Sequence, residues 1–169
     1  MASPQFLVCT NAPSSELALL NSVHVNPQDA RSPYVNIGNF VYRAVPNSDV
    51  DRNHIAMNAV QRRMARALPG ANVEVSDFLV PVSRDFAVKA VTIEAQFLKP
   101  SQTRSMRVLL FDLPNTIRSQ LLGDVITFGQ SIVINYMDSN ILLWVKSNVR
   151  GLVTSQTEIG LVWVGDNTM

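Results

Sequence analysis

The stretch IAMNAVQRRMARALPGANVEV, residues 55–75, combines a short apolar run, a helical pattern and an alternating run. The apolar run predicts a β-strand at residues 55–57, and the alternating run predicts another at residues 72–77. Between them, residues 58–68 have the periodicity of an amphipathic helix, and a Pro-Gly pair follows that is expected to end it. The segment therefore predicts a strand–helix–strand unit.

The helical pattern separates apolar from basic side chains. Its apolar stripe would consist of Val60, Met64 and either Ala67 or Leu68. Arg62, Arg63 and Arg66 fall on the opposite side of the helix, and we expect all three to face solvent.

The rest of the chain consists mainly of short apolar and alternating runs bounded by Pro, Gly, Asn, Asp or Ser. Ten strands are predicted in all, at residues 5–9, 18–25, 34–37, 40–44, 55–57, 72–77, 87–97, 131–136, 141–148 and 158–164. Hairpin turns are expected at NIGN (36–39) and MDSN (137–140). A second helix is predicted at about residues 114–122, with Pro114 in its first turn and Gly123 as a left-handed cap, while residues 106–113 fit a strand or a helix.

Pro, Ser, Arg and Asp cluster at residues 81–85, between two strand patterns, and predict a boundary between units at 1–84 and 85–169. Each unit has the material for its own core, because 47% of the chain is hydrophobic and only 16% is charged. No apolar run approaches the roughly 20 residues that span a bilayer. The single cysteine, Cys9, excludes an internal disulfide. These features favour a soluble cytoplasmic protein.

Half of the positive charge lies in two stretches that contain no acid. Residues 52–73 carry Arg52, Arg62, Arg63 and Arg66, and residues 95–111 carry Lys99, Arg104 and Arg107. Elsewhere there are 7 basic and 13 acidic side chains, so the net charge of +1 conceals a separation of sign. This distribution predicts an acidic partner. A simple solvated helix face would also explain the arginines.

Sequence motifs for catalysis are missing. Neither a phosphate loop (G-x-x-x-x-G-K-[ST]) nor G-x-G-x-x-G nor G-x-S-x-G occurs. His24 and His54 have no partners at metal-ligand spacing. Nothing adjacent to Cys9 would activate its thiol, so we expect a small buried residue there. The sequence predicts no catalytic residue, no metal site and no cofactor in this chain.

Four parts of the chain carry a more specific signal. They are SELALLN (15–21), IAMNAVQRRMARALPGANVEV (55–75), VTIEAQFL (91–98), and FGQSIVINYMDSNILLWVKSNV (128–149) followed by EIGLVWV (158–164). In this order they resemble segments of the N-terminal domain of the vesicle-fusing ATPases, the N-ethylmaleimide-sensitive factors. The resemblance covers nearly the whole chain.

This resemblance implies a mainly β, α+β fold. A double-psi β-barrel would occupy residues 1–84, and a small α/β roll of four strands plus a helix would occupy residues 85–169. In the family the AAA ATPase domains lie downstream and are absent from this chain. ATP and Mg²⁺ would be bound there, and those domains would form a homohexamer, whereas the fragment itself is expected to be monomeric.

The resemblance also implies a role. The family's N-terminal domain is a non-catalytic module that binds SNAP adaptor proteins on a SNARE complex, so that the hexamer can disassemble the SNAREs in membrane traffic. The implied location is the cytoplasm, peripheral to membranes of the secretory pathway. The near alternative is the N-terminal domain of a valosin-containing-protein-like ATPase, which binds other adaptors.

Residues 61–63, Gln-Arg-Arg, match a Gln-Arg-Lys turn of the family. The implied partner-binding residues are Arg62, Arg63, Arg66, Lys99, Arg104 and Arg107. The family has a basic pair where this chain has Lys99 and Pro100, and an arginine near the N-terminus where it has Asn11. We expect the basic residues to line a groove where the two halves meet.

Two alternatives to this role follow, one from the basic stretches and one from the implied fold. Nucleic-acid or anionic-lipid binding is disfavoured, because the net charge is only +1 and residues 52–73 contain no aromatic side chain for stacking. A decarboxylase on a double-psi barrel would need a self-processing Gly-Ser pair, and the sequence has none.

Overall fold

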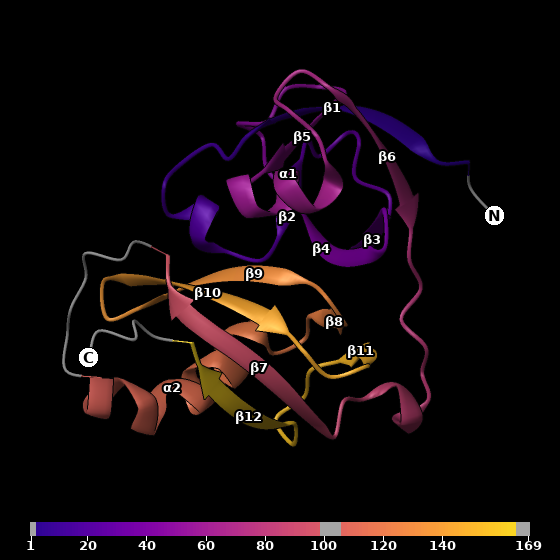
Figure 1. Cartoon of the computed structure of the whole chain (residues 1–169). Coiled ribbons are helices and arrows are strands. Elements are labelled where there is room, and N and C mark those ends of the chain that lie inside the picture. The colour runs from indigo at the N-terminus through magenta and orange to yellow at the C-terminus, as the bar shows by residue number, and fades with distance from the viewer. Residues whose placement is uncertain (1–2, 99–105, 165–169) are drawn as a thin grey trace. The chain divides into compact units, whose positions relative to one another are not determined.

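The computed structural model describes residues 3–98 and 106–164 (Figure 1). The chain divides into two compact units, Met1–Pro81 and Val82–Met169. The sequence prediction placed the boundary after Arg84. Each unit contains its own hydrophobic core.

The first unit is a closed barrel of six strands in the order β1-β5-β2-β4-β3-β6. The strands are β1 (Gln5–Asn11), β2 (Val23–Val25), β3 (Tyr34–Ile37), β4 (Phe40–Pro46), β5 (His54–Met57) and β6 (Asn72–Asp77). A 3-10 helix (Leu17–Leu19) precedes β2, and α1 (Ala59–Ala65) connects β5 to β6. The strand–helix–strand unit predicted from the sequence is therefore β5–α1–β6.

Two barrel pairings are parallel, β1 with β5 and β2 with β4. A hairpin cannot join parallel neighbours, so the chain must cross from one side of the barrel to the other between them. The other pairings are antiparallel. This closed barrel with two crossovers confirms the predicted fold class for the first unit.

The barrel interior is filled by alternate residues of its strands. Leu7 and Cys9 of β1 are buried, whereas their neighbour Phe6 is 66% exposed. In β6, Val73 and Val75 are buried in the same core. Because side chains of a strand point alternately to its two faces, this period of two places one set of side chains inside.

The second unit combines a four-stranded sheet, in the order β12-β7-β10-β9, with one helix and a two-stranded pair of β11 and β8. Its strands are β7 (Ala90–Phe97), β8 (Val125–Thr127), β9 (Ser131–Tyr136), β10 (Ser139–Val145), β11 (Arg150–Leu152) and β12 (Glu158–Trp163). A 3-10 helix (Arg84–Phe86) precedes β7. The helix α2 (Met106–Leu121) contacts β12 and β9, so it lies along the sheet (Figure 1). This arrangement confirms the predicted α/β fold class of the second unit.

The helix α2 is longer than predicted. It begins at Met106, so the ambiguous segment 106–113 is helical and Pro114 lies inside the helix rather than in its first turn. An interior proline removes one backbone hydrogen bond and favours a kink. Leu113 and Ile117, on either side of it, are fully buried in the core of the unit, and this packing stabilises the helix through the proline. Gly123 follows the helix with φ 83°, as its predicted capping role requires.

Other differences concern short elements. The strand predicted at residues 18–25 is wrong in its first part, where Leu17–Leu19 form a 3-10 helix and only Val23–Val25 join the barrel. Strands β8 and β11, three residues each, were not predicted. Both predicted hairpins are confirmed: Gly38 (φ 61°) lies in the β3–β4 turn, and Met137 and Asp138 form the β9–β10 turn, both with positive φ.

The backbone of β11 closely approaches the segment before β7. A Cβ atom added to Gly151 would lie 2.3 Å from the carbonyl oxygen of Phe86 and 2.9 Å from a methyl group of Val88. The amide of Val88 donates to the carbonyl of Leu152 at 2.9 Å, which holds the two segments together. Only glycine fits at this position without displacing the backbone.

None of the helices within residues 3–98 and 106–164 is long and apolar enough to cross a membrane.

Candidate functional site

The helix α1 begins with a reciprocal pair of hydrogen bonds. The Asn58 side chain accepts from the Gln61 amide at 2.8 Å, and the Asn58 amide donates to Gln61 Oε1 at 2.9 Å. This capping box satisfies two of the backbone groups that a helix start leaves unpaired. Both residues are buried.

The same two side chains fasten α1 to the segment before β2. Asn58 Nδ2 donates to the carbonyl of Leu20 at 3.2 Å, and Gln61 Nε2 donates to the carbonyl of Ser22 at 3.1 Å. Gln61 therefore has a structural role, which the sequence did not reveal. Because it precedes the arginines directly, its contacts fix the orientation of the helix that carries them.

Arg62 differs from the other arginines of α1. It is half-buried, and its Nη1 atom donates to the carbonyl of Met57 at 2.7 Å. The prediction that Arg62 faces solvent is therefore correct only in part. One nitrogen of its guanidinium is occupied inside the unit, so the side chain is held in a defined position.

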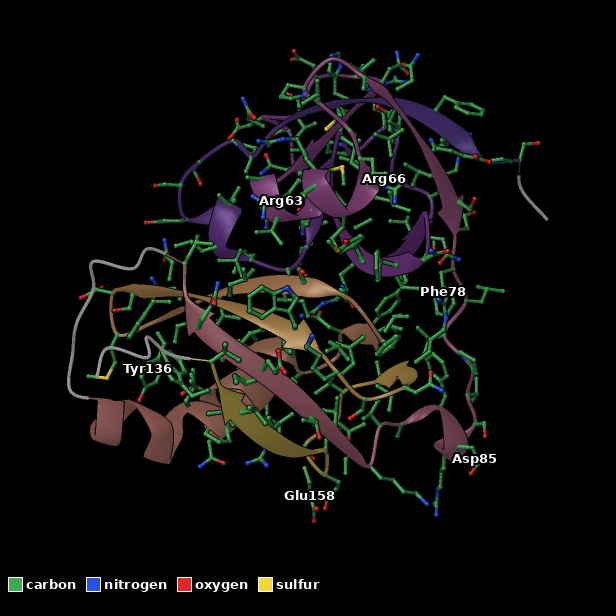
Figure 2. All side chains as sticks on the ribbon, in the orientation of Figure 1. Arg63, Arg66, Phe78, Asp85, Tyr136 and Glu158 are labelled. Atoms are coloured by element: carbon green, nitrogen blue, oxygen red, sulfur yellow. The ribbon has the colours of Figure 1, made fainter. Side chains whose placement is uncertain are left out.

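Arg63 and Arg66 are exposed, as predicted (Figure 2). Arg66 also ends the helix, because its backbone is left-handed (φ 54°, ψ 39°) and its amide donates to the carbonyls of Arg62 and Arg63. The helix thus ends before the Pro-Gly pair that was predicted to stop it. Beyond Arg66 the chain leaves the helical path, and Leu68 is 79% exposed rather than part of the apolar stripe.

The three arginines line one depression in the surface of the first unit, with a volume of about 390 Å³. We call it the basic pocket; its lining residues are Ala59, Arg62, Arg63, Arg66, Ala67, Leu68 and Pro69. No acidic side chain is among them, so the pocket is positively charged and open to an anion. The sequence predicted the cluster of charge, but it did not predict the concave shape.

Arg52, the fourth cation of the first basic stretch, does not line the pocket. Its Nη2 lies 3.0 Å from Oδ1 of the buried Asp29, and its Nε donates to the same oxygen at 3.1 Å. The other oxygen, Oδ2, accepts from the Asn53 amide at 2.6 Å. This ion pair joins two loops of the barrel, so the charge of Arg52 is compensated within the fold.

No residue of the second basic stretch (95–111) is among the described residues that line the basic pocket. Lys99 and Arg104 lie outside the described residues. Arg107 is in the first turn of α2, in the second unit, and its side chain is likewise outside the description. The predicted groove between the two halves stays a prediction.

No protein-family model matches the chain. The vesicle-fusing ATPase of Arabidopsis thaliana is 30% identical to it over 155 residues. The chain is similar to a vesicle-fusing ATPase. The aligned region covers 86% of this chain and 20% of that ATPase, so this chain spans about a fifth of the length of its relative.

That extent fits one domain of a longer ATPase, and the predicted relation to vesicle-fusing ATPases is supported at this level. The similarity spans most of both units, including α1 and the strands around it, because it covers 86% of the chain. The activity named for the relative concerns a protein about five times as long as the aligned region.

The second unit has a depression of its own, of about 450 Å³, which was not predicted. It lies where the segment before β7 meets β11. Asp85 lines it together with Lys89 and Arg150, so acid and base face the same space. This mixture makes it a weaker candidate for an acidic partner than the basic pocket.

Neither cysteine nor metal chemistry emerges from the described residues. Cys9 is buried in the barrel, with its thiol 3.9 Å from the sulfur of Met57. Burial raises the pKa of the Cys9 thiol, an effect that the nearby charge of Arg62 opposes more weakly. The thiol therefore stays protonated and unreactive near neutral pH. Within residues 3–98 and 106–164, no three His, Cys, Asp or Glu side chains form a group that could hold a metal ion.

The stability of the first unit should depend on pH through His24. This residue of β2 is buried, and neither ring nitrogen has a hydrogen-bond partner among residues 3–98 and 106–164. Desolvation lowers the pKa of the imidazole below its usual 6.5. As pH falls below about 6.5, His24 of the unfolded chain binds a proton, whereas His24 of the folded barrel stays neutral. The free energy of unfolding should therefore decrease as the pH is lowered, by at most about 1.4 kcal/mol per pH unit.

Denaturant titrations between about pH 7.5 and about pH 5.5, followed by NMR signals of the barrel, would measure this effect. His24→Leu should flatten the pH dependence. His54→Gln is the matched control, because His54 is only partly buried and its ring contacts the Arg52 carbonyl. An unchanged pH dependence in His24→Leu would show that another group is responsible.

Proposed function

We propose that this chain is a non-catalytic, adaptor-binding N-terminal domain of a vesicle-fusing ATPase, which docks SNAP–SNARE complexes through its basic pocket. The observation that carries this proposal is the convergence of Arg62, Arg63 and Arg66 on one pocket whose lining contains no acid. The similarity to a vesicle-fusing ATPase supports the choice of partner.

The chemistry of the pocket suits an acidic protein surface. A planar guanidinium pairs with a carboxylate through two parallel hydrogen bonds, which fixes geometry as well as charge. Each exposed charge pair contributes only about 0.2–1 kcal/mol. Several pairs acting together accelerate association and select the partner by charge complementarity. The proposed domain therefore recognises its adaptor without binding it permanently.

The parent protein in this proposal is a homohexamer whose ATPase domains lie outside this chain and bind ATP and Mg²⁺. The hexamer would use ATP hydrolysis to take SNARE complexes apart, and would act in the cytoplasm at membranes of the secretory pathway. Lys99, Arg104 and Arg107 are proposed to extend the binding surface. This chain would contribute recognition and no chemical step.

The proposal is tested by titrating the chain with SNAP bound to a SNARE complex at two salt concentrations. The Debye length falls from about 30 Å at 0.01 M to about 8 Å at 0.15 M, so binding through exposed arginines should weaken markedly. Calorimetry or fluorescence anisotropy measures the affinity. SNAP alone and the SNARE complex alone are the controls. Absence of binding at low salt would contradict the proposed partner, and salt-independent binding would contradict the basic pocket as the docking surface.

A further inference from the structure

Arg66 occupies a backbone conformation that does not favour arginine. Its φ of 54° and ψ of 39° are those of the left-handed region at the end of α1. Glycine usually fills this position at the end of a helix, because any side chain brings Cβ too close to the following carbonyl. The backbone hydrogen bonds of Arg66 to Arg62 and Arg63 need no side chain, so they do not explain the arginine.

Contacts of the Arg66 side chain within the fold do not explain the choice of arginine either. It is exposed and makes no hydrogen bond or ion pair within the described part of the chain. It lies one helical turn from both Arg62 and Arg63, and like charges at these spacings repel. The left-handed conformation makes arginine unfavourable here for the stability of the isolated unit. The repulsion between the arginines is offset by the favourable interaction of a cation with the C-terminal end of the helix dipole.

We propose that Arg66 is a specificity-determining residue of the basic pocket, retained at a left-handed position because its guanidinium completes a three-arginine site for an acidic peptide segment. This inference rests on the proposed function and names the ligand class of that site: a stretch of neighbouring carboxylates on a partner protein. Strained residues are kept where function requires their side chains.

The pocket favours a peptide over isolated phosphate groups. Its lining also includes the apolar side chains of Ala59, Ala67 and the exposed Leu68. Glutamate side chains offer aliphatic stems to this surface and carboxylates to the arginines. Arg62 is held in place by the Met57 carbonyl, whereas Arg63 and Arg66 are exposed and adjust to the spacing of the carboxylates.

The central test is Arg66→Gly, measured for stability and for binding. Relief of the left-handed conformation, after subtraction of the entropy that glycine adds to the unfolded chain, should raise the Tm of the barrel by about 2–6 °C. Loss of one guanidinium should weaken binding of a hexaglutamate peptide about two- to fivefold. A variant that is more stable and binds less well is the expected result.

Three further variants separate charge from backbone. Arg66→Asn removes the charge but tolerates the left-handed region, so it should match the affinity loss of Arg66→Gly. Arg66→Lys keeps the charge without the planar fork and should lose less affinity. Arg84→Gly removes an exposed arginine of the second unit, outside the basic pocket, and should leave the affinity unchanged.

Several outcomes would overturn the inference. The proposed role of Arg66 is contradicted if Arg66→Gly binds hexaglutamate as tightly as the unaltered chain does. It is also contradicted if Arg66→Gly is less stable than the unaltered chain. Arg66-dependent binding to phosphatidylserine vesicles without binding to hexaglutamate contradicts the peptide ligand. The same variants are titrated with the SNAP–SNARE complex. If the unaltered chain binds hexaglutamate through Arg66 but does not bind that complex, the proposed function fails while the assignment of Arg66 is supported.

Discussion

Combined reversal of charge at two positions, Arg63→Glu with Arg66→Glu, is expected to weaken binding of the SNAP–SNARE complex about a hundredfold or more. Each substitution replaces an attraction with a repulsion, and like charges brought together in an interface cost several kcal/mol. Both side chains are exposed, so the fold should persist. Calorimetric titration at low salt measures the loss, and circular dichroism verifies the fold.

Arg62 is a poor choice for this experiment. Its bond to the Met57 carbonyl means that Arg62→Glu would place a carboxylate against a carbonyl oxygen, which confuses loss of binding with loss of structure. The matched control is Arg84→Glu with Lys89→Glu, which changes the net charge equally at two exposed positions outside the basic pocket. If both double variants lose binding equally, overall charge rather than the pocket governs association. If neither does, the pocket is not the docking site.

Gly151→Ala is expected to destabilise the second unit by about 3 kcal/mol. The added methyl group would lie 2.3 Å from the Phe86 carbonyl oxygen, a backbone atom that cannot rotate away. Either β11 or the segment before β7 must shift, which disrupts the hydrogen bond from Val88 to Leu152. Urea unfolding followed by tryptophan fluorescence measures the effect on this unit selectively, because the only two tryptophans of the chain, Trp144 and Trp163, belong to it.

The control for this substitution is Gly160→Ala, in strand β12 of the same unit. A methyl group at Gly160 would meet no atom closer than 3.7 Å, which is ordinary contact distance. Gly160→Ala should therefore leave stability unchanged or raise it slightly, since alanine has less freedom in the unfolded chain. Equal destabilisation by both substitutions would refute the close approach at Gly151.

Local chemistry made parts of this structure predictable. Glycine at position 38 and the Met-Asp-Ser-Asn run fixed both hairpins, because turn residues act within four positions of each other. Interactions between distant segments were not predictable. Strands β8 and β11 have three residues each and form a pair across the sequence, so neither had a pattern long enough to predict a strand. In residues 106–113, where periodicity left the choice between strand and helix open, the segment is helical and Leu113 packs in the core of the second unit.

The candidate site shows the same division. The clustering of Arg62, Arg63 and Arg66 was evident from their spacing. The charge of Arg52 is compensated by Asp29, which is 23 residues away in the sequence. The side chain of Arg62 is held by a hydrogen bond to the Met57 backbone carbonyl. Neither contact can be predicted from the spacing of the arginines. The exposure of Leu68 follows from the left-handed Arg66, which no helical periodicity could have indicated. Spacing thus predicted which charges gather, and tertiary contacts determined which of them are available.

The capping box of α1 has a consequence for how such a domain can diversify. Asn58 and Gln61 hold the helix through buried hydrogen bonds, while Arg63 and Arg66 only display charge from it. The side chains that fix the position of the helix are thus different from those that present its positive charge. A lineage, or a protein engineer, could replace the displayed charges and retarget the domain to a basic segment without rebuilding the barrel. Paired with a charge-inverted adaptor, such a domain would form an orthogonal docking module that ignores the original partner.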